Sequence, residues 1–373
     1  MRARRTALAI ALVLGIGVPL AACGSDDPVN HPWRPGGAGP AVVPVVLGAD
    51  VTGTLAAAGA SSQESAMAAW AAAFQSAHPD VVVSYDPVGS GGGRTQFLAG
   101  GIAIAGSDAP LDEAELRAAE ARCAPGAVAE LPLYVSPIAV VFHLPGIDGL
   151  RMTPATLAGV FASEITRWDA PQIAADNPGV DLPSTAITPV VRSDESGTTE
   201  TFTAYLAAAA PEVWRHGATG TWPTPGGQSA QGTSGVVQTV RDGVGTIGYA
   251  DASKAGELGT VALRVAGEDV HHSPEAAAAL LAAAPLAPGR PAASLVVAPA
   301  HADVPGAYPL VLVSYTIACT AYDDAATADL VRAFLGFVAS EEGQALAASA
   351  AGVAPVPDAL REDVMAVVAG IAP

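Results

Sequence analysis

Two long apolar runs constrain the fold of this chain more than any other feature. Residues 131–144 and 308–319 are rich in Val, Ile, Leu and Tyr, and each is long enough for an extended strand. Elsewhere, short strand-like runs alternate with helical segments, which is typical of a mostly parallel sheet covered by helices. Two long strands far apart in the sequence predict that the chain leaves one domain and later returns to it. We therefore expect an α/β fold of two lobes, joined by two hinge strands around a cleft.

Periodicity predicts the remaining elements and, with them, the domain boundaries. Helices are expected at 62–77, 94–98, 111–122, 154–162, 198–210, 236–241, 324–339 and 342–350, and strands at 42–47, 81–85, 102–105, 187–191 and 246–249. The Ala-rich segment 273–293 favours a solvent-facing helix and loop. The resulting division is a first lobe of residues 42–130 plus 316–373 and a second lobe of residues 131–315.

The N-terminus is typical of an export signal. Three arginines in the first five residues precede an apolar run that ends in Leu-Ala-Ala-Cys. The run is shorter than the ~18 residues of a spanning helix. The cysteine resembles that of a bacterial lipobox, which implies cleavage after residue 22 and a lipid on Cys23; the alternative is an ordinary signal peptide with an incidental cysteine. Residues 23–41 then form a Pro- and Gly-rich flexible tether, so we expect a lipid-anchored protein on the extracytoplasmic face of the cell membrane.

The two remaining cysteines, Cys123 and Cys319, belong to a chain expected to be exported, where disulfides persist. An even pair without CxxC spacing predicts one structural disulfide rather than a metal or redox site. Two buried free thiols would have the same sequence pattern. If bonded, the pair would brace the hinge side of the first lobe.

Charge and motif spacing argue against several classes of function. The formal net charge is −19, with no basic run beyond the first five residues, so nucleic acid is not expected as a partner. Neither Ser90 nor Ser196 lies in a G-x-S-x-G motif, and the seven histidines have no positional link to them. The adjacent His271 and His272 favour a solvated loop over a metal site. We therefore expect no enzyme, no cofactor and no metal.

Four segments share one local pattern, in which a strand end is followed by Gly, Ser or Thr and then by a helix start. They are residues 59–62, 89–91, 106–108 and 196–198. Helix N-termini present unpaired backbone N–H groups and a partial positive charge, which together suit a compact oxyanion. Each segment alone is equally typical of an ordinary N-cap. Four of them in one chain predict an oxyanion site.

The charged residues of these segments suggest which oxyanion is bound. Arg192 supplies the only full positive charge among the four segments and suits bidentate contact, with Asp194 orienting it from its far side. The alternative for Arg192 is a surface ion pair. Asp108 would repel an anion unless the anion donates a proton, so it favours phosphate over sulfate. The alternative for Asp108 is a helix N-cap.

Four longer stretches carry a resemblance to a known family. They are GSDAPL at 106–111, residues 160–206 around RSDESGTTETF, GVGTIGYAD at 243–251, and EEGQALAASAAGVAPVPDALRE at 341–362. Over about residues 44–365 the chain resembles the PstS family of periplasmic phosphate-binding proteins of ABC phosphate-uptake systems. The resemblance implies a type II periplasmic-binding fold, a monomer that closes on inorganic phosphate, and membrane permease subunits as partners.

The resemblance also implies the phosphate ligands. These fall on Ser61, Ser62 (through its amide), Ser90 and Asp108 in one lobe, and on Arg192, Ser196, Gly197 and Thr198 in the other. The sequence departs from the family at two positions: Ser62 replaces an aromatic or apolar residue, and Glu195 replaces the glycine that commonly precedes the binding serine. A phosphate sensor or surface interaction lipoprotein not coupled to transport would share all these features, and Asp108 argues against other oxyanions.

Overall fold

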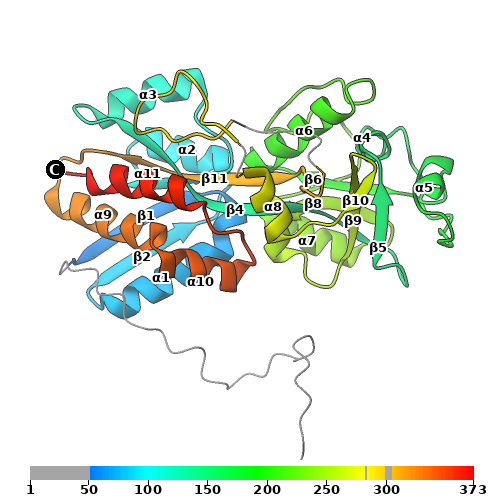
Figure 1. Cartoon of the computed structure of the whole chain (residues 1–373), viewed down its shortest axis with the longest axis horizontal. Helices are drawn as coiled ribbons and strands as arrows, with labels where there is room; N and C mark the ends of the chain where they lie inside the picture. Colours follow the sequence, from blue (N-terminus) through cyan, green and yellow to red (C-terminus); the bar gives the residue numbers. More distant parts are fainter. Residues whose placement is uncertain (1–50, 282–283, 299–304) are drawn as a thin grey trace, which may run out of the picture. The chain divides into compact units, whose positions relative to one another are not determined.

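The structure, a computed structural model, describes residues 51–281, 284–298 and 305–373 (Figure 1). The predicted signal segment, Cys23, the tether and the strand expected at 42–47 lie outside the described residues. The helices described are α1 (Glu64–Ala77), α2 (Ser90–Leu98), α3 (Glu113–Cys123), α4 (Pro154–Phe161), α5 (Pro171–Asp176), α6 (Gly197–Ala209), α7 (Gly232–Asp242), α8 (Pro274–Leu281), α9 (Ala325–Ala339), α10 (Glu341–Ala351) and α11 (Asp358–Ala369). Two short 3-10 turns, η1 (Ser61–Gln63) and η2 (Ala252–Lys254), complete the helical segments.

The strands form one continuous hydrogen-bonded path in the order β2-β1-β3-β11-β4-β8-β6-β7, with β5, β9 and β10 attached beside it. They are β1 (Gly53–Gly59), β2 (Val81–Asp86), β3 (Ile104–Ser107), β4 (Val128–His143), β5 (Gly149–Met152), β6 (Thr188–Arg192), β7 (Gln228–Ala230), β8 (Thr246–Asp251), β9 (Gly259–Val265), β10 (Glu268–Val270) and β11 (Val311–Cys319). β1 is parallel to β2 and β3, and β6 is parallel to β7 and β8. β4 and β11 run antiparallel to their neighbours.

Strand β4 joins the two halves of this path. Its residues Val128–Pro137 pair with β11, whereas Ile138–His143 pair with β8. Every residue of β4 is buried except His143 at its end, which explains why the sequence shows an apolar run instead of a polar–apolar alternation. The result is two α/β lobes connected through shared strands, as the sequence predicts.

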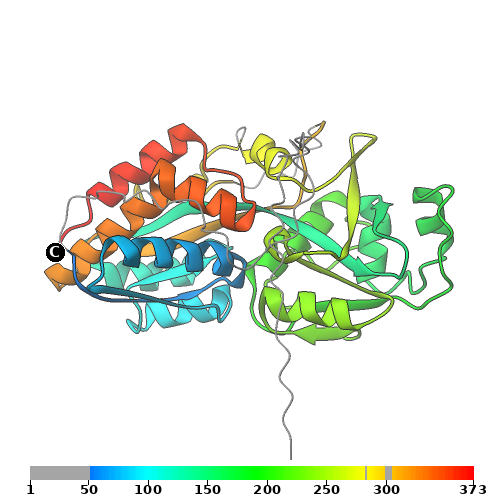
Figure 2. The same ribbon diagram turned by 90° about the horizontal axis from the view of Figure 1, so that it is seen from below.

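Helices at both ends of the chain cover the first lobe. Helix α1 packs against α10 and α9, and α11 packs on α9, so the orange helices lie between the blue α1 and the red α11 (Figure 2). Phe74 of α1 makes an edge contact with Phe334 of α9, with ring centroids 5.3 Å apart. Aromatic pairs of this geometry add to the burial of apolar area, so they hold the C-terminal helices on the first lobe.

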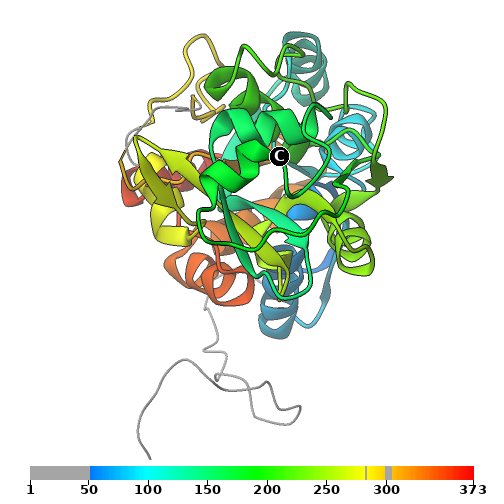
Figure 3. The same cartoon turned by 90° about the vertical axis from the view of Figure 1, so that its right-hand side faces the viewer.

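The second lobe, drawn in green, faces the viewer in Figure 3. Its core includes the ring pair Phe142 of β4 and Trp168, with centroids 5.5 Å apart. The Trp168 indole N–H also donates to the backbone oxygen of Gly245, at 3.1 Å, which satisfies its polar atom inside the core.

The predicted disulfide is confirmed. Cys123, at the end of α3, is bonded to Cys319, at the end of β11. Both cysteines are buried in a small cluster with Phe97 and Ile317. The bond therefore ties a helix to a strand within the first lobe.

Several expected elements differ from those observed. The sequence predicts a helix only from residue 94, but α2 begins at Ser90, because the glycines of its first turns pack closely against strand β1: a Cβ on Gly93 would lie 2.5 Å from Gly59 Cα. The Ala-rich segment begins with the expected helix, α8, but this helix faces solvent on one side only: Glu275 and Ala279 are exposed, whereas Ala277, Leu280 and Leu281 are buried. The strands β1, β5, β7, β9 and β10, the short helix α5 and the 12-residue helix α11 were not predicted.

Candidate oxyanion-binding site

The four predicted segments converge where the lobes meet. β1 ends at Gly59 immediately before η1, β3 ends at Ser107, and the N-termini of α2 and α6 lie at Ser90 and Gly197. Carboxyl ends of parallel strands reach the same edge of a sheet, and in open α/β sheets that edge is where ligands bind. The topology thus explains how segments far apart in sequence form one site.

Asp108 lies at the centre of the cluster and is buried, with 5% of its surface exposed. Its Oδ1 accepts hydrogen bonds from the hydroxyls of Ser62 and Ser314, both at 2.6 Å. Its Oδ2 accepts from the Thr198 hydroxyl at 2.8 Å, and its backbone N–H donates to Ser90 Oγ at 3.1 Å. One carboxylate therefore connects donors from both lobes.

Burial raises the pKa of Asp108 above its ordinary value, while the hydroxyls of Ser314, Ser62 and Thr198 and the charge of Arg192 act in the opposite direction. Each carboxylate oxygen has two lone pairs. The two donors on Oδ1 and the one on Oδ2 leave a single acceptor position on Oδ2. A buried carboxylate with one acceptor position left is suited to an anion that carries a proton.

Arg192, at the end of β6, is the buried cation of the site, with 2% of its side chain exposed. Its Nε donates to Asp194 Oδ1 at 2.8 Å and its Nη2 donates to Asp194 Oδ2, so the pair is bidentate. Its Nη1 lies 3.5 Å from Thr198 Oγ1. Asp194 thus fixes the Nε and Nη2 atoms of the guanidinium, and Nη1 is directed toward Thr198, which is bonded to Asp108.

Asp194 is itself held in place by a second contact, because it accepts from the backbone N–H of Gly232 at 3.0 Å. Burial would raise the pKa of Asp194, but the hydrogen bonds and charge of Arg192 hold it below its ordinary value. Asp194 therefore keeps its negative charge and fixes the orientation of Arg192.

The N-terminus of α6 packs closely against Asp108 and Ala109 of the first lobe. Ser196 caps this helix, accepting from the backbone N–H of Thr199 at 3.2 Å. A Cβ on Gly197 would lie 2.6 Å from Asp108 Cβ and 2.7 Å from the backbone N of Ala109, so no side chain fits there. The absence of a side chain at Gly197 lets the positive end of α6 approach Asp108 closely.

Ser61 makes its contacts across the cleft. Its Oγ lies 3.1 Å from Thr233 Oγ1 and accepts from the backbone N–H of Thr233 at 3.0 Å. Thr233 lies in the first turn of α7, which belongs to the other lobe. All eight predicted ligands therefore gather at the lobe boundary: Ser61, Ser62, Ser90, Asp108, Arg192, Ser196, Gly197 and Thr198.

Comparison with known proteins identifies the family. The PBP superfamily domain matches residues 45–342 of the chain. The phosphate-binding protein PstS3 of Mycobacterium bovis is 31% identical over 377 residues, which cover 100% of both chains. The chain belongs to the PstS family of phosphate-binding proteins. The resemblance found in the sequence is thus confirmed over the full length of a PstS relative.

Solved structures confirm the fold of this PstS chain. A high affinity periplasmic phosphate-binding protein (PfluDING) bound with phosphate superposes with a TM-score of 0.67 at 21% identity, covering 84% of this chain and 93% of that one. A putative phosphate ABC transporter substrate-binding protein with bound phosphate from Clostridium perfringens gives a TM-score of 0.59 at 19% identity, covering 82% and 100%. Both confirm the two-lobed α/β fold predicted from the sequence.

Two polar residues of the PstS site were missed in the sequence. Ser314 lies within the second long apolar run, and nothing in its sequence neighbourhood marks it. It donates to Asp108 beside a register shift in the β4–β11 ladder: Ser314 is opposite Tyr134 and Tyr315 is opposite Pro132, so Leu133 is skipped. Thr233 follows Gly232 at a helix start, so the criterion that found the other four segments could have found it.

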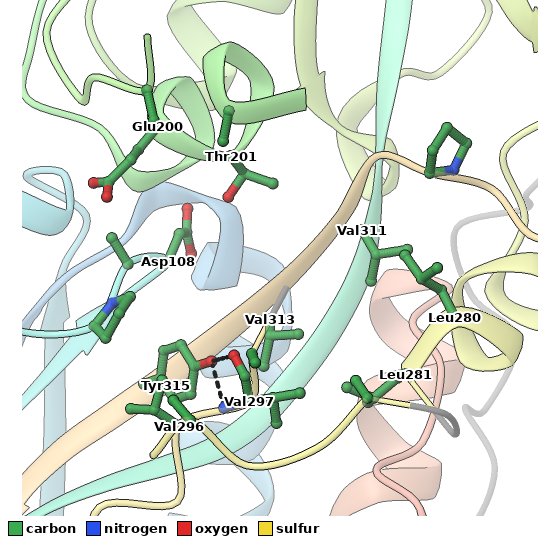
Figure 4. Close-up of a pocket in the computed structure, with 18 of the residues that line it drawn as sticks. Asp108, Glu200, Thr201, Leu280, Leu281, Val296, Val297, Val311, Val313 and Tyr315 are labelled. Atoms are coloured by element: carbon green, nitrogen blue, oxygen red, sulfur yellow. Dashed lines mark hydrogen bonds between the residues drawn. The ribbon is translucent and has the colours of Figure 1, made fainter. Parts of the chain in front are cut away.

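A separate apolar cavity of about 400 Å³ lies beside Asp108 (Figure 4). Its walls include Val311 and Val313 of β11, Leu280 of α8 and Thr201 of α6. Arg290, the cation of its described lining, is already bonded to the backbone oxygen of Leu111. Because its walls are mainly apolar, this cavity does not suit a compact oxyanion. The hydroxyl and guanidinium groups around the Asp108 carboxylate do.

The described residues contain neither a metal-binding cluster nor a membrane-spanning helix. Among residues 51–281, 284–298 and 305–373, no group of three or more His, Cys, Asp or Glu side chains could hold a metal ion. Within the same ranges, no helix is both long enough and apolar enough to cross a membrane. The PstS relatives carry the names of binding proteins rather than of enzymes.

Proposed function

We propose that this chain binds inorganic phosphate in the cleft between its lobes. The observation that carries the proposal is the buried Asp108 carboxylate, which is surrounded by hydroxyl, amide and guanidinium donors from both lobes. Such a set offers many donors and one acceptor, and that is the pattern a partly protonated phosphate matches. The full-length relative at 31% identity, named a phosphate-binding protein, supports the same conclusion.

In the proposed complex, phosphate oxygens accept from both lobes at once. The first lobe supplies the hydroxyls of Ser61 and Ser90 and the amide of Ser62. The second supplies the Nη1 group of Arg192, the hydroxyl of Ser196, and the backbone amides of Gly197 and Thr198 at the positive end of α6, while the Thr198 hydroxyl keeps its bond to Asp108. Asp108 accepts the phosphate O–H. Because these contacts form together only when the lobes are closed, phosphate shifts the population toward closure.

Calorimetric titration of the soluble body with phosphate and with sulfate tests this function. Sulfate has no proton to donate at neutral pH, so it would leave Asp108 unpaired and repelled. We expect phosphate to bind more tightly by about a hundredfold or more. A protein that binds no phosphate, or that binds sulfate equally well, would contradict the proposal.

We further propose that the chain delivers phosphate to the permease of an ABC import system and performs no chemistry on it. The Clostridium perfringens protein described above, a putative ABC transporter component, supports this role for the fold. A lipid on Cys23 would hold a monomer at the extracytoplasmic face of the cell membrane. Radiolabelled phosphate uptake tests it: uptake should fall in cells that lack the chain, and unchanged uptake would favour a sensor or surface interaction role.

The boundaries of the lobes stay a prediction. We propose a first lobe of residues 42–130 plus 316–373 and a second of residues 131–315. The strand pairing supports the first crossing, since β4 changes partner between Pro137 and Ile138. Limited proteolysis with and without phosphate would map the segments between the lobes.

A further inference from the structure

A second buried arginine lies beside the phosphate ligands without being one of them. Arg94 is in α2, the helix that begins with Ser90, and 6% of its side chain is exposed. Its Nε donates to Glu115 Oε1 at 2.8 Å, and its Nη1 donates to Ser107 Oγ at 3.1 Å. Both partners belong to the first lobe.

The third contact of Arg94 crosses to the second lobe. Its Nη2 donates to Glu195 Oε1 at 2.6 Å. Glu195 is the residue directly before Ser196. One guanidinium therefore connects the end of β3, directly before Asp108, with the loop that precedes Ser196.

Glu195 also packs on the backbone of α2. Its carbonyl oxygen accepts from the backbone N–H of Gly91 at 3.3 Å. A Cβ placed on Gly91 would lie 2.4 Å from Glu195 Oε2 and 2.8 Å from Glu195 Cβ. Gly91 is in the first turn of α2, so alanine suits its backbone; the obstacle to a side chain at this position is Glu195.

We propose that Glu195 is a positioning residue for phosphate binding, acting through its closing contact with Arg94 and Gly91. The proposal rests on the function proposed above and adds a residue outside the phosphate ligands. The contact joins the two lobes, so it is lost whenever the cleft opens. It therefore adds to the population of the closed form and slows the release of phosphate, because apparent affinity scales with the fraction of the protein in the binding-competent state.

The exposure of Glu195 and the second partner of Arg94 determine how much the Arg94–Glu195 contact slows the release of phosphate. The Glu195 side chain is 55% exposed, and half-exposed ion pairs contribute modestly. Arg94 keeps Glu115 as a partner when Glu195 is neutralised, so the buried cation is not left unpaired. We expect Glu195→Gln to raise the phosphate dissociation rate about threefold to tenfold, and salt to reduce this difference.

A steric test separates this role from general stability. Gly91→Ala should keep or raise the melting temperature measured without phosphate, because alanine favours a helix over glycine. The same substitution should weaken phosphate binding by about tenfold or more, because the new methyl group occupies the position of the Glu195 side chain in the closed form. Combining it with Glu195→Gly should return the affinity to that of Glu195→Gly alone.

The controls are a helical glycine and an ion pair away from the cleft. Gly336→Ala in α9 meets only Val368, at 3.9 Å, and Glu113→Gln removes an exposed pair with Arg117. Both should bind phosphate as the unsubstituted chain does. Stopped-flow release of phosphate and calorimetry on the folded variants provide the measurements.

The outcomes are separable from those of the proposed function. If the unsubstituted chain binds no phosphate, the function itself is wrong. If it binds phosphate and Gly91→Ala binds equally well, or Glu195→Gly gives no relief, the closing contact is overturned. Should Gly91→Ala fail to fold, Glu195→Gln decides alone, and an unchanged release rate contradicts the proposal.

Discussion

Asp108 illustrates how a single residue can set the specificity of the site. Its carboxylate accepts from Ser62, Ser314 and Thr198, which leaves one acceptor position on Oδ2, the oxygen that is bonded to Thr198 in the first turn of α6. The same atom thus attracts a protonated oxyanion and rejects one without a proton. Selectivity in this arrangement comes from an acceptor, although donors supply most of the binding energy.

Substitution of this residue gives a direct prediction. Asp108→Asn removes the negative charge and adds an amide N–H₂, so sulfate gains a donor while phosphate loses its proton acceptor. We expect the ratio of phosphate to sulfate affinity to narrow by about tenfold or more. Parallel calorimetric titrations measure both affinities, with Asp323→Asn on the exposed surface as the control. A ratio unchanged from that of the unsubstituted chain would count against the acceptor role.

The residues of the site also differ in how well their position there could be predicted from the sequence. Ser90, Asp108 and Thr198 follow strand ends or start helices, where a local pattern exists. Ser314 has no such pattern, because a register shift in a buried strand brings it to Asp108. The Arg94–Glu195 pair depends on two lobes meeting, and its members are separated by 101 positions. Contacts of this kind follow from tertiary packing, which a single sequence does not display.

At the scale of elements, the long strands were predictable because burial on both faces leaves an uninterrupted apolar run. The short strands β5, β9 and β10 were not, since a few residues of mixed polarity give no period to measure. The start of α2 was missed because glycine disfavours helices by itself, and here packing against β1 outweighs that preference. Tertiary contacts therefore decide the elements whose local signal is weak.

A buried acid on strand β8, which accepts a hydrogen bond from strand β4, makes the stability of the protein depend on pH. Asp251, at the end of β8, accepts from Tyr134 Oη at 3.0 Å and from the backbone N–H of Ser253 at 2.9 Å. Burial raises the pKa of Asp251 to about 6, although hydrogen bonds from Ser253, Ser136 and Tyr134 act in the opposite direction. The folded state thus prefers the protonated carboxyl.

The sign of the effect follows from this preference. In the unfolded chain the carboxyl titrates near pH ~4, so its stabilising contribution is complete below that pH and is lost as the pH rises through about 6. Asp251→Asn removes the dependence. Relative to the unsubstituted chain, its free energy of unfolding should rise by about 2 kcal/mol between pH 4 and pH 7. Urea unfolding at several pH values measures it; a constant difference between the two proteins would refute the prediction.

At the scale of the whole molecule, both terminal parts of the described chain belong to the first lobe, and the second lobe is inserted between them. The disulfide lies entirely within the first lobe, between α3 and β11. It therefore braces one lobe and leaves the motion between the lobes unrestricted. Stability and lobe closure are for this reason separable properties.

That separation can be measured. Replacing both cysteines with serine should lower the free energy of unfolding by about 2 to 5 kcal/mol, since the bond restricts the unfolded chain. Phosphate affinity at a temperature where the variant is folded should stay within about twofold, because additivity holds for distant, independent sites. Chemical denaturation and calorimetry check the two halves of the prediction. A large loss of affinity would show that the bond also controls the cleft.

The continuity of β4 determines how the lobes can open and how fast the amides of this strand exchange. Its residues are paired with β11 along one half and with β8 along the other, and the register shift leaves only Leu133 without a partner in β11, so β4 has no unpaired stretch beyond this residue at which the lobes could separate. Opening must then occur by twisting an intact ladder. Backbone amides of β4 should accordingly be among the last to exchange with deuterium, even in a protein whose cleft has opened and closed many times during the experiment.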